Sequence, residues 1–178
     1  MRIRKTVLAA VMTLATPTIV LSTPVAEAQP APITWEDCPS YVNRPGAQCG
    51  RIDVPRDYSK PEAEKISVGF MQFNPQSAKE PVFVNPGGPG GSVYSHYGSS
   101  EFMQFPDEYF SRFNIVAVQP RGLAGSTGLD CVEHLNPHTP VDSLYRKGAM
   151  FREACEAAQP GLVGAITTEN TARDWEEV

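Results

Sequence analysis

A segment rich in glycine and proline, NPGGPGGS at residues 85–92, constrains the fold of this chain most strongly. It follows a short apolar run, PVFV at residues 81–84, which predicts a strand. Glycine permits positive φ and a close approach by another molecule, whereas proline stiffens the same backbone. A loop with both properties can hold backbone N–H groups toward an anion, as an oxyanion hole requires. The segment, called the glycine loop below, therefore predicts part of an active site.

Two other interpretations of the glycine loop stay open when it is taken alone. Isolated segments of Gly and Pro are most often plain tight turns. A phosphate-binding loop is disfavoured, because no Gly-Lys-Ser/Thr follows and because the G-G-P-G-G spacing does not fit the dinucleotide-binding pattern.

The first residues have the pattern of a secretory signal peptide. A basic start, RIRK at residues 2–5, precedes a largely apolar run at 7–21 and an A-E-A cleavage signal at 26–28. The apolar run is too short and too interrupted by proline to favour a retained membrane anchor. We therefore expect residues 1–28 to be removed and the mature, secreted chain to begin at Gln29.

Charge and composition narrow the classes of partner. The formal net charge is −5, and loss of residues 1–28 makes it more negative because three basic residues and one acidic residue leave. A negative chain without basic clusters argues against nucleic acid and against stable association with an anionic membrane. Hydrophobic residues make up 41% of the chain, as in ordinary globular proteins. We expect residues 29–178 to form part of one globular domain.

Four cysteines follow the predicted signal peptide: Cys38, Cys49, Cys131 and Cys155. An even number in an exported chain predicts two disulfides, for which three pairings exist. We expect the local pairing, Cys38–Cys49 and Cys131–Cys155, in which each bond closes a short loop and stabilises the fold by about 3 kcal/mol. A zinc site is disfavoured, because the sequence has no Cys-x-x-Cys spacing and the two pairs lie far apart.

The apolar pattern predicts strands and helices that alternate after an irregular start. Strands are expected at 50–54, 65–73, 81–85 and 114–119, after irregular structure at 31–48, and helices in part of 93–113, at 143–158 and at 168–178. Asp142 or Ser143 is expected to cap the second helix, and Thr171 with Asp174 the third. This order predicts an α/β fold: the N-terminal portion of a mostly parallel sheet, incomplete at the C-terminus.

A second motif, QPRGLAGSTGLDC at residues 119–131, follows the predicted strand at 114–119. Together with the glycine loop, it resembles the α/β-hydrolases of the secreted tripeptidyl aminopeptidase and proline iminopeptidase group. The resemblance extends from the region of Trp35 and Cys38 to the helix at 168–178. It implies that the strand at 114–119 lies between the strands at 65–73 and 81–85, which leaves 81–85 as an exposed apolar edge.

The resemblance implies a role for the glycine loop in catalysis. The second glycine of the family's loop, here Gly88, offers its backbone N–H to the tetrahedral oxyanion, and the residue after the nucleophilic serine supplies the other donor. The neighbouring Gly87, Pro89 and Gly90 are expected to support this donor. Proline iminopeptidases carry His where Pro86 stands, whereas the tripeptidyl aminopeptidase branch has Asn-Pro, as here.

The resemblance also implies a supporting role for the second motif. The family's Arg-Gly-x-Gly-x-Ser turn buttresses the oxyanion loop, and Arg121, Gly122 and Ser126 match it. The turn departs from the family in two places, because Gln119 replaces the usual Asp and Ala124 replaces the second glycine.

Ser126 could itself be mistaken for a nucleophile, because AGSTG at residues 124–128 looks like a variant nucleophile elbow. An elbow requires a strand that leads directly into the serine and a helix that leads directly out. Pro120 interrupts the first connection, and Cys131 is followed by further prolines without a helix. We therefore expect Ser126 to be structural.

The three histidines are not expected to be catalytic. His134 and His138 have i, i+4 spacing, but Pro137 would break the helix that a metal pair on one face requires. His96 is expected to be a partly exposed loop residue just after the glycine loop, and its alternative role is to line the substrate cleft. We therefore predict no metal site and no cofactor.

The resemblance implies an exported serine hydrolase, most directly an aminopeptidase that releases residues or short peptides from peptide N-termini. In this fold the catalytic Ser, Asp or Glu, and His all follow a fifth strand. Since the sequence ends at Val178 before such a set, we expect the chain by itself to lack the triad and to be inactive. An esterase on the same fold and a non-catalytic exported binding protein are the alternatives.

Overall fold

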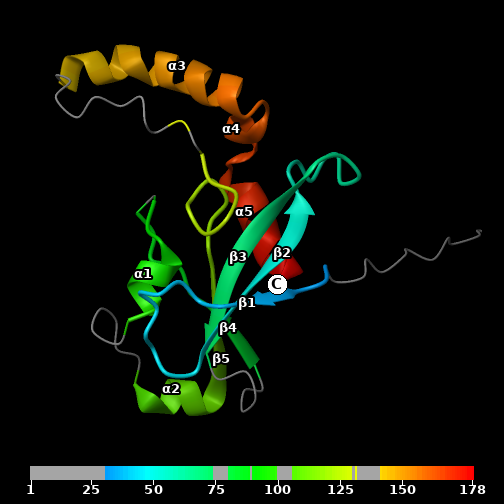
Figure 1. Cartoon of the computed structure of the whole chain (residues 1–178), viewed down its shortest axis with the longest axis vertical. Helices are drawn as coiled ribbons and strands as arrows, with labels where there is room; N and C mark the ends of the chain where they lie inside the picture. Colours follow the sequence, from blue (N-terminus) through cyan, green and yellow to red (C-terminus); the bar gives the residue numbers. More distant parts are fainter. Residues whose placement is uncertain (1–30, 74–79, 89, 100–105, 130, 132–140) are drawn as a thin grey trace, which may run out of the picture.

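The computed structural model of the chain describes residues 31–73, 80–88, 90–99, 106–129, 131 and 141–178, so the predicted signal peptide lies outside the described residues. Within these ranges five strands form one sheet in the order β1-β2-β3-β5-β4 (Figure 1). The strands are β1 (Thr34–Glu36), β2 (Ala47–Pro55), β3 (Lys65–Phe73), β4 (Glu80–Phe83) and β5 (Phe113–Val118).

The sheet is mixed, and the expectation of a mostly parallel sheet is wrong for the described strands. The pairs β1–β2, β2–β3 and β3–β5 are antiparallel, and β4–β5 is parallel. The connections explain this arrangement. A turn at residues 56–64 joins β2 to β3, which is too short for the crossover that a parallel pair needs. Two helices lie between β4 and β5 and provide such a crossover.

The predicted position of β5 is confirmed. It lies between β3 and β4, with Phe70 of β3 opposite Val118 and Val82 of β4 opposite Ile115. Strand β4 is consequently the outermost strand on its side of the described sheet, as the family resemblance implied. Its parallel pairing with β5 brings the carboxyl ends of both strands, and the loops that follow them, to the same edge.

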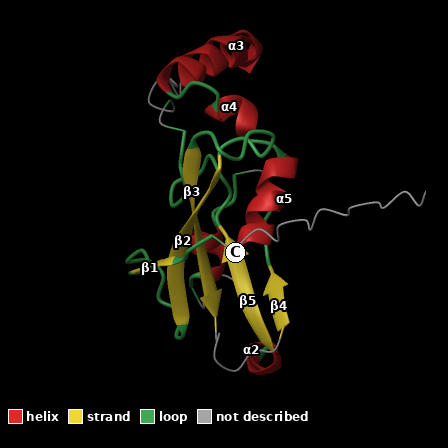
Figure 2. Ribbon diagram, turned by 90° about the vertical axis from the view of Figure 1, so that its right-hand side faces the viewer, coloured by secondary structure: helices red, strands yellow, loops and turns green. Residues whose placement is uncertain are grey.

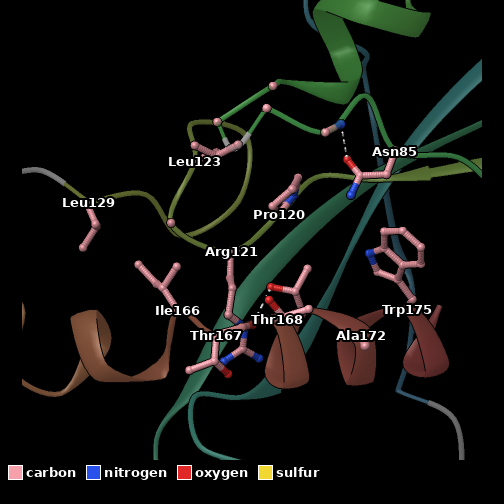
Figure 3. Close-up of a pocket in the computed structure, with 16 residues that line it drawn as sticks. Asn85, Pro120, Arg121, Leu123, Leu129, Ile166, Thr167, Thr168, Ala172 and Trp175 are labelled. Atoms are coloured by element: carbon pink, nitrogen blue, oxygen red, sulfur yellow. Dashed lines mark hydrogen bonds between the residues drawn. The ribbon is translucent and has the colours of Figure 1, made fainter.

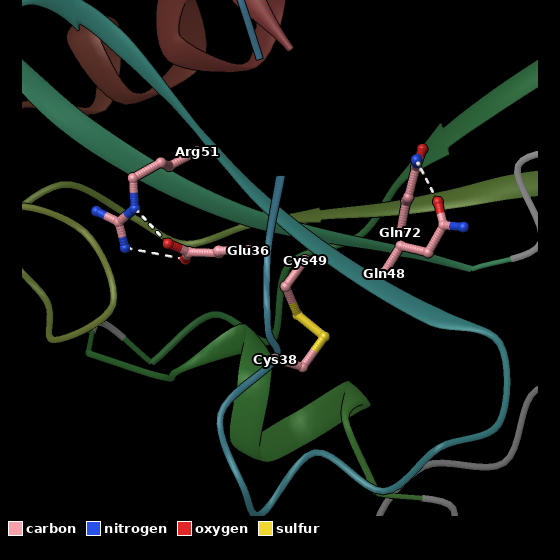
Figure 4. The surroundings of a disulfide bond; sticks show 6 residues. All are labelled: Glu36, Cys38, Gln48, Cys49, Arg51 and Gln72. Carbon is pink, nitrogen blue, oxygen red and sulfur yellow. Dashed lines mark hydrogen bonds and ion pairs between the residues drawn. A yellow bond between two sulfur atoms is a disulfide. The ribbon is translucent and has the colours of Figure 1, made fainter. Parts of the chain in front are cut away.

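The N-terminal segment is more regular than its sequence indicates. Residues 31–48 were expected to be irregular, but β1 pairs with β2 and β2 already begins at Ala47. Glu36 lies opposite Cys49 in this pairing, next to the Cys38–Cys49 disulfide, and its carboxylate forms an ion pair with Arg51 (Figure 4). A three-residue strand is too short to show an alternating pattern in the sequence. The disulfide and the ion pair with Arg51 attach it to β2.

Five helices are described, and Figure 2 shows helices above, beside and below the sheet. They are α1 (Val93–Tyr97), α2 (Asp107–Arg112), α3 (Val141–Ala158), α4 (Leu162–Ala165) and α5 (Thr168–Glu177). The three predicted helical regions are present, and α4 is an additional short turn of helix. None of the described helices has the length and apolar character needed to cross a membrane.

Both predicted helix caps are wrong. Helix α3 begins at Val141, so Asp142 and Ser143 lie inside it. Helix α5 is capped by Thr167, whose hydroxyl accepts a hydrogen bond from the backbone N–H of Asn170. Thr171 lies within α5 and donates to the carbonyl of Thr167. The T-x-x-N sequence one turn earlier thus provides the cap, and Asp174 is left for another role.

The core consists of two layers, one on each face of the sheet. Alternate residues of β3 and β5 face opposite layers, so Met71 packs with α1 on one face and Phe70 packs toward α4 and α5 on the other. The first layer contains Cys49, Met71, Phe73, Val93, Tyr94, Tyr97, Ile115 and Ala117, and the second contains Ile52, Val54, Ile66, Val68, Phe70, Val116, Val118 and Leu162. Burial of both faces explains the continuous apolar run in β5.

Both predicted disulfides are present. The Cα atoms are 5.1 Å apart in Cys38–Cys49 and 5.0 Å apart in Cys131–Cys155. The second bond anchors the C-terminal part of α3, a helix that projects away from the sheet (Figure 1), to the end of the segment that follows β5. Gln159 reinforces this anchor by donating a hydrogen bond to the carbonyl of Gly128.

We expect the double substitution Cys38→Ser with Cys49→Ser to lower the free energy of unfolding by about 3 kcal/mol, because the bond removes entropy from the unfolded chain. Urea denaturation of the full chain under oxidising conditions measures this difference. The same comparison in excess reductant is the control, and there the two proteins should differ much less. Equal stability under oxidising conditions would contradict the predicted contribution.

Candidate functional site

The candidate site lies at the carboxyl ends of the parallel strands β4 and β5 (Figure 3). The glycine loop follows β4, and the turn formed by residues 119–128 follows β5. Ligands of α/β proteins bind at the carboxyl ends of strands, where loops from neighbouring strands converge. The sequence therefore brings its two most distinctive motifs together at the edge of the sheet that favours a site.

The glycine loop adopts backbone conformations that favour glycine. The φ angles of Gly87, Gly88 and Gly90 are 76°, 128° and 96°, a region that residues with a Cβ atom rarely adopt. The side-chain oxygen of Asn85 accepts a hydrogen bond of 3.0 Å from the Gly87 N–H. The Gly91 N–H donates to the Gly87 carbonyl at 3.1 Å. These two bonds close the loop on itself, and Pro89 lies outside the described residues.

The loop leaves backbone donors available. Within the part of the chain that the structure describes, the amides of Gly88 and Gly90 form no hydrogen bond, and both residues are exposed. Both glycines also line a cavity of about 780 Å³. Unpaired N–H groups beside a cavity can donate hydrogen bonds to a bound anion or to a carbonyl oxygen.

The cavity is a largely apolar space between the two loops and helix α5. Figure 3 shows Asn85 and Trp175 on one side of it and Leu123, Leu129 and Ile166 on the other. Its lining residues are Asn85, Gly87, Gly88, Gly90, Gly91, Pro120, Arg121, Gly122, Leu123, Leu129, Ile166, Thr167, Thr168, Thr171, Ala172 and Trp175. The ring of Trp175 stacks on Phe83 of β4, with centroids 5.9 Å apart, and so attaches α5 to the edge strand.

Arg121 forms a buried ion pair with Asp174 beneath this cavity. Its Nε and Nη2 atoms donate to the two carboxylate oxygens at 2.8 and 2.5 Å, and both side chains are almost completely buried. The remaining guanidinium N–H groups donate to the carbonyls of Pro55, Arg56 and Ala165. All five donors of the guanidinium therefore have acceptors, as burial of a charge requires.

Tyr58 completes the environment of this ion pair. Its hydroxyl donates to the Asp174 carboxylate at 2.9 Å, and the Arg121 guanidinium lies 5.5 Å from the centre of its ring. Burial, together with the negative charge of Asp174, raises the pKa of the Tyr58 hydroxyl well above its usual range. Tyr58 thus remains a protonated donor to Asp174 throughout the neutral pH range.

Ser126 is held by two hydrogen bonds in the turn after β5. Its hydroxyl donates to the Gln119 carbonyl at 2.7 Å and accepts from the Gly69 N–H at 2.9 Å. The neighbouring Thr127 bonds to both backbone groups of Ser67. The single hydroxyl proton of Ser126 is therefore engaged, and the turn is attached along β3. Neither a strand nor a helix directly flanks Ser126, whereas a nucleophile elbow has a strand directly before the serine and a helix directly after it.

Gly122 allows the turn to pack closely on the segment between α4 and α5. Its φ is 87°, and a Cβ atom built at this position would lie 2.7 Å from the Cδ1 atom of Ile166. Any larger residue would therefore push Ile166 away or displace the turn. This contact helps to shape the wall of the cavity that Gly122 and Ile166 both line.

Of the three histidines, His96 alone lies among the described residues, and it does not line the cavity. It lies in α1 instead of in a loop as expected, is partly buried and has its ring 6.3 Å from that of Tyr97. His134 and His138 lie outside the described residues. A search of the described part of the chain for groups of His, Cys, Asp and Glu that could hold a metal ion finds none.

Sequence reasoning missed the partners of the second motif. Asp174 was interpreted as part of a helix cap, whereas it is the counter-ion of Arg121. Tyr58 and Gln119 also form hydrogen bonds to distant residues, which no local pattern indicates. The available signal was weak: a buried Arg in a turn requires a carboxylate partner, but the sequence does not show which acidic residue approaches it.

We expect Arg121→Met or Asp174→Leu to lower the free energy of unfolding by about 3–5 kcal/mol, because either change leaves an uncompensated buried charge. The double variant should lose less than the two single losses combined. Glu169→Ala, which breaks the exposed pair with Arg173, is the matched control and should change stability by less than about 1 kcal/mol. Urea denaturation of the full chain checks these values, and single losses no larger than that of the control would refute the assignment.

No protein-family model matches the chain. Individual proteins, however, are similar to it. A tripeptidyl aminopeptidase of Streptomyces coelicolor is 29% identical over 86% of this chain and 32% of its own length. The serine protease Hip1 of Mycobacterium tuberculosis is 35% identical over 53% of this chain and 19% of its own length. Carboxylesterase B of Mycobacterium tuberculosis is 26% identical over 82% of this chain and 32% of its own length.

The chain thus spans about a third of the length of the aminopeptidase that it matches. The names of these relatives describe peptidases and an ester hydrolase, and they agree with the resemblance carried by the two loops. The matches confirm that resemblance: the chain is similar to a tripeptidyl aminopeptidase over 86% of its length and to the serine protease Hip1 over 53%.

Proposed function

We propose that the chain carries the oxyanion-binding part of an exported serine hydrolase. The observation that carries this proposal is the pair of unpaired, exposed amides of Gly88 and Gly90 at a mainly apolar cavity. During acyl transfer the carbonyl oxygen of the substrate gains negative charge, and preorganised N–H donors stabilise it. In this proposal the Gly88 N–H is one such donor, and the residue after a nucleophilic serine provides the second.

The surrounding residues hold this donor in place. Gly87, Gly88 and Gly90 provide the positive φ angles of the loop. Below the loop, Arg121 joins the turn after β5 to α5, and Ser126 joins the same turn to β3. Rigid support matters because an oxyanion donor contributes most when it need not reorient as charge develops.

We propose peptides as the substrates, with cleavage near their N-termini. The match to a tripeptidyl aminopeptidase over most of this chain supports this choice. Ester hydrolysis is the second candidate, because a carboxylesterase matches over nearly the same share of the chain. The oxyanion site serves both reactions, since amide and ester hydrolysis pass through a tetrahedral intermediate of the same kind. The third candidate function is that of an exported binding protein without catalytic activity.

We further propose that the protein is exported after removal of residues 1–28. The signal-peptide pattern supports this proposal, and the two disulfides agree with an oxidising compartment. In this proposal Ser126 supports the oxyanion loop and is not the nucleophile, because its hydroxyl proton is bonded to the Gln119 carbonyl.

We expect Gly88→Ala to lower kcat/KM of the whole protein by about 10²–10³, because the loop must move and the donor is then misdirected. A Cβ atom on Gly88 would lie 3.0 Å from the nitrogens of Gly90 and Gly91. Gly46→Ala is the control: it also places alanine at positive φ but meets no atom within 4 Å. Hydrolysis of tripeptide anilides and of short-chain nitrophenyl esters measures the effect and distinguishes the two candidate reactions. Unchanged rates in Gly88→Ala would remove the basis of the proposal.

We expect residues 29–178 alone to resist labelling by a fluorophosphonate probe, since the Ser126 hydroxyl is held by two hydrogen bonds in the turn. Gel fluorescence and intact mass measure the labelling. Labelling that disappears in Ser126→Ala would show that Ser126 is a nucleophile, and the assignment of the turn as a support would then be wrong.

A further inference from the structure

Gln119 is the residue directly after β5, and its side chain is buried between the glycine loop and the turn that follows β5. The residue is completely inaccessible to solvent. Its amide oxygen accepts a hydrogen bond of 2.9 Å from the Val93 N–H. Its amide nitrogen donates to the Ala124 carbonyl at 2.6 Å and to the Ser92 hydroxyl at 3.3 Å. One side chain thus contacts both loops of the candidate site.

The amide oxygen of Gln119 accepts a hydrogen bond from the first turn of α1, for which the residue before the helix provides no side-chain acceptor. Val93 is the first residue of α1, and the N–H groups of a first helical turn have no partner within the helix. Ser92 stands at the N-cap position, but its side chain makes no capping hydrogen bond. Gln119 supplies the missing acceptor from another strand, and so determines where α1 begins and the glycine loop ends.

The amide nitrogen of Gln119 forms bonds that a carboxylate side chain at this position could not form. A glutamate could still accept from the Val93 N–H, but it could not donate to the Ala124 carbonyl. Its negative charge would instead face that carbonyl at a buried position, which is costly. The arrangement therefore requires a neutral side chain that donates and accepts at once.

Both ends of the glycine loop are consequently fixed to β5. At the start of the loop, the Val84 N–H donates to the Val116 carbonyl of β5 at 2.9 Å. At its end, Gln119 holds Val93, and the backbone N–H of Gln119 itself donates to the Gly69 carbonyl of β3. The loop spans two anchor points that belong to the same short stretch of backbone.

We propose that Gln119 is the positioning residue of the glycine loop: its buried amide fixes the distance between the loop and the turn after β5, and thereby the direction of the Gly88 N–H. The catalytic part of this statement rests on the proposed function. The positioning role does not rest on the proposed function, because it concerns only the conformational order of the glycine loop.

The test is NMR relaxation and amide exchange on the full chain with Gln119→Leu and Gln119→Glu. Gln72→Leu is the matched control, because Gln72 also makes side-chain hydrogen bonds, to Gln48 and Asn114, without contacting the glycine loop. In Gln119→Leu we expect the order parameters of Gly87, Gly88 and Gly90 to fall from about 0.85 to below about 0.6, and the Val93 amide to exchange about tenfold faster or more.

Gln119→Glu separates the two halves of the amide. It should keep the Val93 amide protected while the glycine loop still loses order, because the nitrogen that donates to the Ala124 carbonyl and to the Ser92 hydroxyl is lost. This isosteric variant also keeps the test valid if Gln119→Leu does not fold. Wild-type order parameters for the loop in Gln119→Glu, with the amides of β3 protected as in the wild type, would overturn the proposal.

Kinetics of the whole protein then connect positioning to catalysis. Gln119→Glu should lower kcat by about tenfold or more with little change in KM, because the loop acts on the transition state. If the wild type neither hydrolyses the substrates nor reacts with a fluorophosphonate, the proposed function fails while the order parameters still decide the role of Gln119. A disordered loop with unchanged kcat would overturn the catalytic part alone.

Discussion

The ion pair between Arg121 and Asp174 is the interaction on which the candidate site depends. Burial of two charges is costly, and it is tolerated here because every guanidinium N–H has an acceptor and because Tyr58 donates to the carboxylate. The acceptors belong to the end of β2 and the turn after it, to the end of α4 and to α5. The β2 region and the α4–α5 region, which are far apart in the sequence, are thereby held around one side chain.

The geometry of the cavity follows from this connection. One wall consists of the turn after β5, which begins two residues before Arg121, and another consists of the first turns of α5, which also carry Asp174. Gln119 extends the same framework to the glycine loop through Val93. The Arg121–Asp174 pair holds the turn after β5, and the amide of Gln119 holds the glycine loop. Both loops are therefore positioned by residues at the end of β5 or directly after it.

The parts of this structure that the sequence predicts are those defined by local patterns. Strand β3 matches its predicted bounds, Lys65–Phe73, because alternation is strong there, and the glycine loop follows its strand as expected. The failures concern contacts between distant residues. The mixed sheet, the short β1 and the counter-ion Asp174 each depend on a partner that lies elsewhere in the chain. The family resemblance predicted the insertion of β5 between its neighbours, which no periodicity could have shown.

Strand β4, an edge strand of the described sheet, contains a proline that limits pairing on its outer side. The Val84 N–H points toward β5, so in a parallel pair the N–H of Val82 does the same and positions 81 and 83 direct theirs outward. Position 81 is a proline, which has no N–H to offer. The outer side of β4 therefore lacks one of its two donors. A strand that approaches this side of β4 finds the N–H of Phe83 but none at position 81, which restricts the registers in which it can pair.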